Sequence, residues 1–257
     1  MSSKKFIKMK YIILFIFLNL VSMAATAFTV LIDPGHGGDD TGAKSKMTGS
    51  EKQILEKDLA LSISKKVYDK LKPFHSVYLT RSIDRNVTLK ERSELAEKIK
   101  ADIFVSIHLN SAPSKDSNGV EIYYLDNHND VAVKKVENLE NIIVAGEEQQ
   151  INHILTDLII QQTVDQSKLL ASSLDTSIKK GVVIKHKMKN RGVRPGLFYV
   201  LALAKRPGVL IEVGFISNQE ELKKLQLESF QTDMSNAIVE GILKFSRAQK
   251  KPKVSLF

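Results

Sequence analysis

The sequence predicts a single α/β domain with a twisted, mostly parallel mixed sheet of about six strands, covered by helices on both faces. Short β-branched and apolar runs alternate with helical patterns along most of the chain, as in a parallel sheet with helical crossovers. The 257 residues suffice for one well-buried core. Neither an internal repeat nor a low-complexity tract is visible, which excludes a repeat architecture.

The first elements are a strand, a tight turn and a helix. The apolar run FTVLID at 28–33 predicts a strand, and it stops at the turn-forming sequence PGHGG over 34–38. Apolar residues near helical spacing predict a helix over 53–71, which ends before Pro73.

Two further strands and a helix continue the alternation. A strand is expected at 75–80, and Thr88 begins a helix with Glu91 at capping-box spacing. The runs DIFVSIH at 102–108 and VEIYYL at 120–125 predict two more strands.

The second half of the chain interrupts this rhythm. Residues 130–150 form a polar insertion, which we interpret as part of the same domain. Apolar residues three and four apart predict a core-facing helix over 152–174. Two short strands at 197–202 and 209–213 and an amphipathic helix at 229–245 complete the prediction.

The N-terminus has the three regions of a secretory signal peptide. Four lysines precede an apolar run, and small residues follow it up to Ala27. The apolar run is shorter than the about 20 residues that span a bilayer, and retention of the segment as a membrane anchor is the alternative. We therefore expect a signal peptide at 1–27, the folded domain at 28–249 and a basic tail at 250–257.

Charge and cysteine content limit the possible partners and metal sites. Loss of the four signal-peptide lysines lowers the net charge from +9 to 9 − 4 = +5. A basic protein suits anionic polymers, and export favours the acidic cell wall over nucleic acid. No nucleic-acid partner is expected, because basic and aromatic residues are not interleaved. Without cysteine, a metal must be held by His, Asp or Glu.

Three ionisable residues fall at or near the ends of predicted strands, where α/β proteins bind ligands. They are His36, His108 and Glu212. Two histidines and one carboxylate with an open position are typical of a catalytic zinc site, so a further carboxylate is needed if Glu212 is the base. The candidates are Glu51, Glu56 and Asp58. Structural roles are expected for His75, His128, His153 and His186.

Five segments, in order along the chain, carry a family resemblance. They are LIDPGHGGDDTGA (31–43), EKDLALSIS (56–64), TRSIDRNVTLKER (80–92), SIHLNS (106–111) and VLIEVGFISN (209–218). Together they resemble the zinc-dependent N-acetylmuramoyl-L-alanine amidases with an amidase-3 type catalytic domain. This resemblance covers nearly all of the chain after residue 27.

The resemblance implies an activity and a set of site residues. Zn²⁺ would be coordinated by His36, Glu56 and His108, and Glu212 would act in catalysis. Zinc-activated water would cleave peptidoglycan between N-acetylmuramic acid and the L-alanine of the stem peptide. Glu51 is also followed by lysine, but only Glu56 continues with the Lys-Asp and apolar residues of the family pattern.

Further residues are candidates for substrate binding. Asn110 fits the SIHxN pattern and is expected to orient the substrate or the metal shell. Arg194, together with Arg81 and Arg92, is a candidate for binding stem-peptide carboxylates. The alternative is that these are ordinary surface arginines.

The insertion over 130–150 lies where some Gram-negative members of the family carry an inhibitory helix. In those members an activator protein displaces the helix from the zinc. By this resemblance, Glu140, or failing that Glu137, would coordinate zinc as a plug. The alternative is that both are solvated acids.

Two other functions stay open at this point. The same metal set could serve a zinc peptidase that cuts within the stem peptide, and an inactive wall-binding homologue is the non-catalytic alternative. The retained His36, Glu56, His108 and Glu212 argue against the latter. We expect an exported monomer, in the periplasm or else secreted or associated with the cell wall.

Overall fold

The computed structural model describes residues 28–141 and 153–249 of the protein. The expected signal peptide at 1–27, residues 142–150 of the insertion and the expected tail at 250–257 lie outside the described residues. In the described part of the chain, no helix is both long and apolar enough to cross a membrane.

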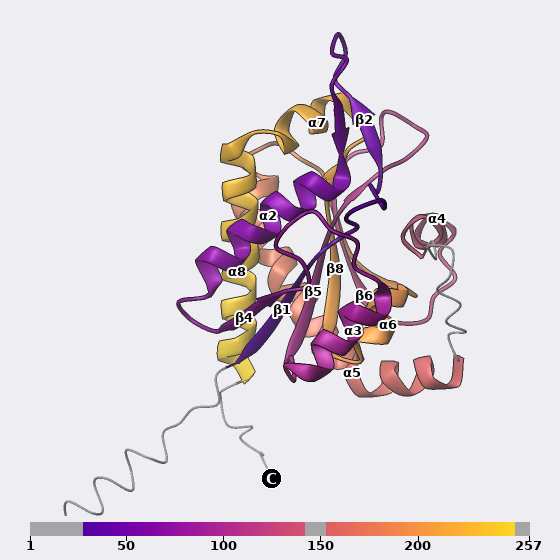
Figure 1. The fold of residues 1–257 in the computed structure, drawn as a ribbon, viewed down its shortest axis with the longest axis vertical. Helices are drawn as coiled ribbons and strands as arrows, with labels where there is room; N and C mark the ends of the chain where they lie inside the picture. Colours follow the sequence, from indigo (N-terminus) through magenta and orange to yellow (C-terminus); the bar gives the residue numbers. More distant parts are fainter. Residues whose placement is uncertain (1–27, 142–152, 250–257) are drawn as a thin grey trace, which may run out of the picture.

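A six-stranded sheet forms the centre of the molecule (Figure 1). Its strands are β1 (Thr29–Pro34), β4 (Ser76–Leu79), β5 (Ile103–Asn110), β6 (Val120–Leu125), β7 (Asn190–Gly196) and β8 (Gly208–Phe215). They lie in the order β4-β1-β5-β8-β6-β7. The first four are mutually parallel, β6 is antiparallel to β8, and β7 is parallel to β6. The predicted mixed, mostly parallel sheet is confirmed.

Helices cover the sheet with two separate hydrophobic cores. One core contains side chains of α2 (Glu56–Leu71), α5 (His153–Ile178) and α8 (Glu228–Gln249). The other contains side chains of α3 (Leu89–Lys98), α4 (Val131–Glu140) and α6 (Tyr199–Ala204). Adjacent strand residues divide between them, since Ile32 belongs to the first core and Leu31 to the second. The sheet is therefore buried on both faces, as predicted.

The capping box predicted for α3 is present. The Thr88 side chain accepts a hydrogen bond from the Glu91 N–H, and the Glu91 carboxylate accepts one from the Thr88 N–H. These two bonds satisfy backbone donors that the first turn of a helix leaves free. The helix begins at Leu89 as a result.

The predicted helix over 53–71 begins later, at Glu56. Residues 53–55 form β3 (Gln53–Leu55), which pairs antiparallel with β2 (Lys44–Lys46) in a small two-stranded sheet. Pairing with a segment nine residues earlier overrides the helical pattern at these three residues. As a result, Glu56 is the first residue of α2.

The strand predicted at 197–202 is wrong. The chain forms β7 before this segment, and Tyr199–Ala204 is the helix α6. A short apolar run such as LFYVLALA does not distinguish a buried strand from a buried helix. Gly192 and Pro195 also weaken the strand pattern of β7, but both are tolerated because this strand lies at the edge of the sheet.

Two shorter helical elements were also not predicted. They are α7 (Gln219–Leu225), which begins at an Asn218 cap, and a π-helical turn over Lys179–Val183.

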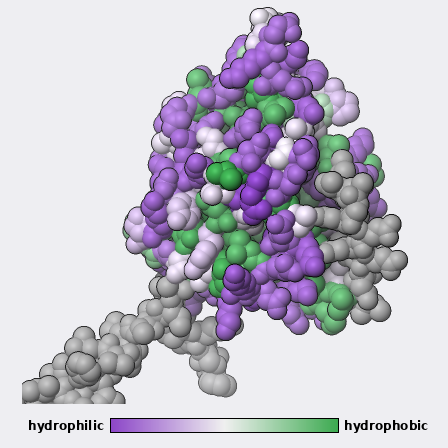
Figure 2. Space-filling view, viewed as in Figure 1, coloured by the Kyte–Doolittle hydropathy of each residue, from purple (hydrophilic) through white to green (hydrophobic). Residues whose placement is uncertain are grey.

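On the face shown in Figure 2, hydrophilic side chains cover most of the surface, and hydrophobic side chains gather in smaller areas between them.

Candidate metal centre

The chain turns sharply after β1 and places His36 at the end of that strand. His36 itself has a left-handed backbone, with φ of 58°, and Gly37 and Gly38 follow with φ of 132° and 61°. Such a conformation is strained for a histidine and persists only where the surroundings hold it. The turn predicted over 34–38 is therefore present, and both glycines lie in it.

Two buried arginines hold the backbone of this turn. Arg81 donates to the carbonyls of Gly35 (2.7 Å) and Lys57 (2.8 Å), and Arg92 donates to the carbonyl of His36 (3.0 Å). Only 2% of Arg81 and 6% of Arg92 is exposed. Their interpretation as ordinary surface arginines is therefore wrong, because both bind the chain itself.

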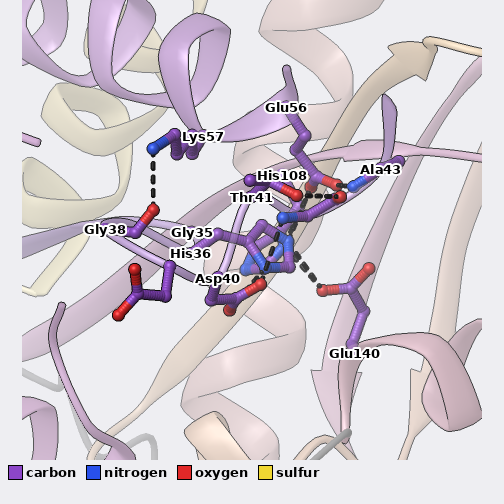
Figure 3. A network of polar contacts seen from close by, with 12 residues as sticks. Gly35, His36, Gly38, Asp40, Thr41, Ala43, Glu56, Lys57, His108 and Glu140 are labelled. Atoms are coloured by element: carbon purple, nitrogen blue, oxygen red, sulfur yellow. Dashed lines mark hydrogen bonds and ion pairs between the residues drawn. The ribbon is translucent and has the colours of Figure 1, made fainter. Parts of the chain in front are cut away.

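Four side chains converge beyond this turn and could hold a metal ion. The potential ligand atoms of His36, Glu56, His108 and Glu140 all lie within 4.8 Å of one another. Glu56 Oε1 is 3.1 Å from His36 Nε2 and 3.2 Å from His108 Nδ1. Glu140 Oε2 is 2.7 Å from His108 Nδ1 and 3.5 Å from His36 Nε2. Figure 3 shows Glu56 and Glu140 approaching the histidines from different elements.

Glu56 enters the cluster from the first residue of α2. Its carboxylate accepts hydrogen bonds from the N–H groups of Ala43 (2.8 Å) and Leu109 (2.9 Å). Burial alone would raise the pKa of Glu56, but the charges and hydrogen bonds of His36 and His108 lower the pKa below its ordinary value. The carboxylate is thus held ionised, in a fixed orientation and at a helix N-terminus that favours negative charge.

Glu51, the alternative carboxylate, is not part of this cluster. Its side chain is fully exposed between β2 and β3, and it pairs with Lys46 at 3.3 Å. Glu56 is 1% exposed and lies in the cluster. Of the two, only Glu56 occupies a position suited to a metal ligand.

Asp40 orients His36 from behind the cluster. Its carboxylate lies 2.9 Å from His36 Nδ1, which leaves Nε2 facing Glu56 (Figure 3). A carboxylate on the second ring nitrogen is a common way to fix the tautomer of a metal-binding histidine. Sequence reasoning missed Asp40, although its spacing of four residues from His36 within GHGGDD was a usable signal.

Two glycines are required because the ligands pass so close to the backbone. A Cβ on Gly35 would lie 2.5 Å from the His108 ring. A Cβ on Gly42 would lie 2.5 Å from the His36 ring and 2.6 Å from Glu56 Oε2. Side chains at these positions would displace the ligands, so the glycines shape the cluster as well as the turn.

Glu212 lies beside the cluster on β8. It is fully buried, and neither carboxylate oxygen has a hydrogen-bond partner among the described residues. In the strand register it is opposite His108 of β5. Burial, followed by the nearby charge of Glu140, raises the pKa of Glu212 well above its ordinary value. An unpartnered buried carboxylate is costly, which indicates a chemical role for Glu212.

The donor set fits a divalent cation such as zinc. Two imidazoles and two carboxylates meet in a buried space, so positive charge is required between the carboxylates. Burial alone would lower the pKa of His108, but the carboxylates of Glu140 and Glu56 together raise it to about 10. Nitrogen and oxygen ligands of these types are those of catalytic zinc sites.

Comparison with known proteins assigns this arrangement to a family. The family Amidase_3, described as N-acetylmuramoyl-L-alanine amidase, matches residues 30–244. The chain belongs to this family. Its members cleave peptidoglycan between N-acetylmuramic acid and L-alanine.

Individual amidases are similar over most of this chain. AmiA of Escherichia coli (strain K12) is 33% identical over 227 residues, covering 84% of this chain and 75% of AmiA. Probable N-acetylmuramoyl-L-alanine amidase AmiB of Haemophilus influenzae is 34% identical over 248 residues, covering 91% of this chain. This chain spans only 56% of the length of that AmiB.

Solved amidase structures share the fold. The crystal structure of an N-acetylmuramoyl-L-alanine amidase from Clostridium difficile 630 has a TM-score of 0.67 and 31% identity, covering 88% of this chain and 100% of that one. The CwlD amidase from Clostridioides difficile, in complex with the GerS lipoprotein, has a TM-score of 0.64 and 29% identity, covering 86% and 98%.

Two cavities of the amidase domain border α4. One, of about 390 Å³, is lined by residues that include His36, His108 and Glu140. The other, of about 360 Å³, contains Asn110 and Arg194, the two predicted substrate-binding residues. Asn110 and Arg194 therefore share a cavity that is separate from the one at the cluster. Residues of α4 line both cavities.

Asn110 and Arg194 differ in how far they are engaged by the protein. Asn110 is 2% exposed, and its Nδ2 has no hydrogen-bond partner among the described residues. Arg194 pairs with Asp130, the cap of α4, at 3.3 Å. A free amide donor suits substrate binding, whereas Arg194 also holds the insertion.

The two acids proposed as plugs occupy different places. Glu140 lies in the cluster, as described above. Glu137 accepts a hydrogen bond from the Leu197 N–H and lies 2.5 Å from His128 Nε2, and it is not one of the four clustered residues. Glu137 thus contacts the segment after β7, and Glu140 contacts the histidines.

Two other described histidines contact residues outside the cluster. His75 Nε2 lies 2.9 Å from Ser246 Oγ, and His186 Nε2 lies 2.7 Å from Asp233. Both pairs join elements of the domain away from the cluster. The side chain of His153 lies outside the part of the chain that is described.

Proposed function

We propose that this chain is an active amidase that hydrolyses the bond between N-acetylmuramic acid and L-alanine, with one Zn²⁺ held by His36, Glu56 and His108. The observation that carries this proposal is the convergence of these three side chains beside the unpartnered carboxylate of Glu212. Family membership supports the choice of zinc and of peptidoglycan as substrate.

Zn²⁺ held by His36, Glu56 and His108 would lower the pKa of bound water toward ~7 and would polarise the substrate carbonyl. Glu212 is assigned as the general base, because burial favours its neutral form after it accepts a proton. The same group then returns the proton to the leaving alanine amine. Asp40 keeps His36 oriented throughout, and no covalent intermediate or organic cofactor is required.

The described conformation is assigned as a resting form in which Glu140 takes the open metal position. Its carboxylate lies within 3.5 Å of both histidines, and the side chain is only 9% exposed. A carboxylate there would exclude the catalytic water. An activator protein that binds the insertion and withdraws α4 would then start the reaction. We assign Asn110 and Arg194 to substrate binding in the active form.

The cellular setting is part of the proposal. The basic, apolar and small-residue regions of 1–27 support export, and residues 28–249 then form the amidase domain. We assign the protein to the periplasm or, failing that, to the cell wall or the medium, as a monomer. The CwlD amidase, a related structure, is itself in complex with a lipoprotein.

Mass spectrometry of digested peptidoglycan tests the activity. Purified sacculi are treated with zinc-loaded protein starting at residue 28, both wild type and Glu140→Ala. The expected products are free stem peptides beginning with L-alanine and glycan strands bearing intact lactyl groups. Cleavage within the stem peptide would indicate a zinc peptidase, and no product from either protein would indicate an inactive wall-binding homologue.

The same substitution tests the role of Glu140. Its removal should raise basal release of dye-labelled peptidoglycan by roughly one to three orders of magnitude, at ~1.4 kcal/mol per tenfold. Glu94→Ala, which removes an exposed acid of α3, is the matched control and should not change the rate. An unchanged rate in Glu140→Ala at equal zinc content would contradict inhibition by this residue.

A further inference from the structure

The end of α4 is bound to the backbone that follows β7. Asn141, directly after the helix, donates from Nδ2 to the Leu197 carbonyl and accepts from the Tyr199 N–H through Oδ1, both at 2.8 Å. One turn earlier, the Glu137 carboxylate accepts from the Leu197 N–H. Three backbone groups of Leu197–Tyr199 are therefore occupied by side chains of the insertion.

The Asn141 contacts have the pattern of a strand residue. In a parallel pair of strands, one residue donates its N–H to a carbonyl of the neighbouring chain and accepts from the N–H two residues further along. The Asn141 amide makes this pair of bonds with Leu197 and Tyr199. A side-chain amide has the donor and acceptor of a peptide group, so it imitates one residue of an added strand.

This strip of backbone shares a cavity with the candidate metal centre. Phe198 lies between the two bonded residues and lines the cavity of about 390 Å³ that also contains His36 and His108. Glu140 and Asn141, adjacent in sequence, therefore place a carboxylate at the histidines and an amide on the strip. In the substrate, the scissile carbonyl likewise comes first and the stem peptide follows it.

We propose that the Leu197–Tyr199 backbone is the binding strip for the stem peptide, and that Asn141 and Glu137 imitate this peptide in the described form. The ligand class is an extended peptide, of which one residue pairs with Leu197 O and Tyr199 N. The Leu197 N–H would bind a further oxygen of the same peptide. This inference rests on the proposed function, because it assumes that α4 leaves the site before the substrate enters.

The chemistry of α6 makes the strip receptive once α4 has left. Tyr199 is the first residue of α6, and its cap residue, Phe198, makes no side-chain hydrogen bond to the helix. The first N–H groups of a helix have no partner within it. Withdrawal of Asn141 would thus leave the Tyr199 N–H and the Leu197 carbonyl without these two partners and open to an incoming peptide.

Tyr199→Pro removes the N–H that donates to Asn141, with little disturbance of the backbone. Proline lacks an N–H and is well accepted at the first position of a helix. The preceding Phe198 has φ −83° and ψ 123°, the extended conformation that a residue before proline prefers. Tyr199→Ala is the matched control, since it removes the side chain and keeps the N–H. Both changes are made with Glu137, Glu140 and Asn141 replaced by alanine, so that the helix does not compete.

Steady-state kinetics on two substrates give the first readout. Loss of one hydrogen bond to the peptide should raise the KM of Tyr199→Pro for N-acetylmuramoyl tetrapeptide roughly two- to tenfold over Tyr199→Ala, with kcat little changed. With N-acetylmuramoyl-L-alanine the two variants should differ less. Equal KM values on the tetrapeptide would overturn the strip.

A binding measurement separates this inference from the proposed activity. In the variant that has alanine in place of Glu137, Glu140 and Asn141 and also carries Glu212→Gln, ¹⁵N NMR follows the amides of Leu197 and Tyr199 as N-acetylmuramoyl tetrapeptide is added. Both should shift and become protected from exchange, whether or not the wild type cuts this bond. Hydrolysis by the active protein without any change at these amides would sustain the activity and refute the strip.

Discussion

Glu212 makes a residue-scale prediction that separates chemistry from metal binding. Glu212→Gln keeps the shape of the side chain and removes the proton acceptor, while His36, Glu56 and His108 stay intact. Zinc content should therefore match the wild type, and turnover should fall by roughly 10²–10⁴, the range of general acid-base groups. The measurement is the rate in a Glu140→Ala background together with metal analysis. Turnover near that of the parent would remove Glu212 from its role.

Asp33 makes a second prediction at this scale, concerning stability and pH. It is 1% exposed and accepts hydrogen bonds from Thr80 (2.6 Å), Ser106 (2.8 Å) and Arg92. Burial alone would raise the pKa of Asp33, but Arg92 and the two hydroxyls lower it below its ordinary value. Side chains from β1, β5 and α3, together with Thr80 just after β4, thus meet at one ionised carboxylate directly before the turn over 34–38.

Replacing Asp33 with Asn should lower the free energy of unfolding by about 3–5 kcal/mol near neutral pH, as when one partner of a buried pair is removed. A group with a depressed folded pKa stabilises above its unfolded pKa, and this stabilisation is lost as pH falls through the folded pKa. The difference between the two proteins should therefore be constant above about pH 5 and shrink below the ordinary value of 3.8. Urea unfolding at several pH values tests this, and a difference independent of pH would refute it.

The candidate site residues were predictable from the sequence, whereas the residues that position them were mostly not. The five ordered segments pointed to His36, Glu56 and His108, and the structure brings them together. Asp40 contacts the His36 ring, and Arg81 contacts the backbone of the turn. Their roles depend on distances that residue spacing in the sequence does not reveal. The unpartnered state of Glu212 also emerges only in the folded chain.

At the scale of elements, α4 is held at both ends by different contacts. Asp130 caps its first turn, accepting from the Ala132 N–H at 2.8 Å, and pairs with Arg194. Glu137 and Asn141 fasten its last turn to the segment after β7. Apart from Glu140, which contacts His36 and His108, the helix has few other attachments, since only Val133 and Glu137 are buried on it. Its position therefore depends on a small number of polar contacts.

Asp130→Ala should weaken the first of these attachments and favour release of the helix. Loss of a cap costs about 0.5–2 kcal/mol, which would raise the basal amidase rate roughly two- to thirtyfold if the helix is inhibitory. Asn218→Ala, which removes the cap of α7, is the matched control. It should lower stability comparably and leave the rate unchanged. Equal rate increases in both variants would point to general loosening and not to α4.

Elements with a local signal were predicted well, and those set by distant pairing were not. The α3 boundary follows from its capping box, which is contained in four residues. The hairpin of β2 and β3 and the edge strand β7 depend on partners elsewhere in the chain, and their Lys, Gln, Gly and Pro residues have weak strand preference. The missed strand β7 precedes the peptide strip, so this error concealed a feature of the site.

At the scale of the molecule, the sheet collects the site from distant parts of the chain. His36 follows β1, His108 lies near the end of the parallel strand β5, and Glu212 lies on the neighbouring strand β8. The strands β6 and β7 run opposite to β8. The insertion between β6 and β7 brings Glu140 to the cluster. The alternation of strands and helices predicted the parallel part, but the reversal at β6 has no signature in the sequence.

Because the cluster joins these elements, metal binding should stabilise the whole domain. A ligand that binds only the folded state at about 100 times its Kd contributes ~2.7 kcal/mol. For a domain of this size that is a rise in Tm of roughly 5–10 °C on adding zinc to chelator-treated protein. Calorimetry should show this rise in the wild type and in Glu51→Ala, whose side chain is exposed on the hairpin.

The rise should be absent or much smaller in His36→Ala and His108→Ala, because each change removes one of the three proposed ligands. Glu140→Ala should keep part of the rise, since His36, Glu56 and His108 remain, and lose the part that a fourth ligand adds. A full rise in either histidine variant would exclude that histidine as a ligand. A full rise in Glu140→Ala would leave Glu140 beside the metal without a bond to it, and inhibition would then rest on exclusion of substrate by α4.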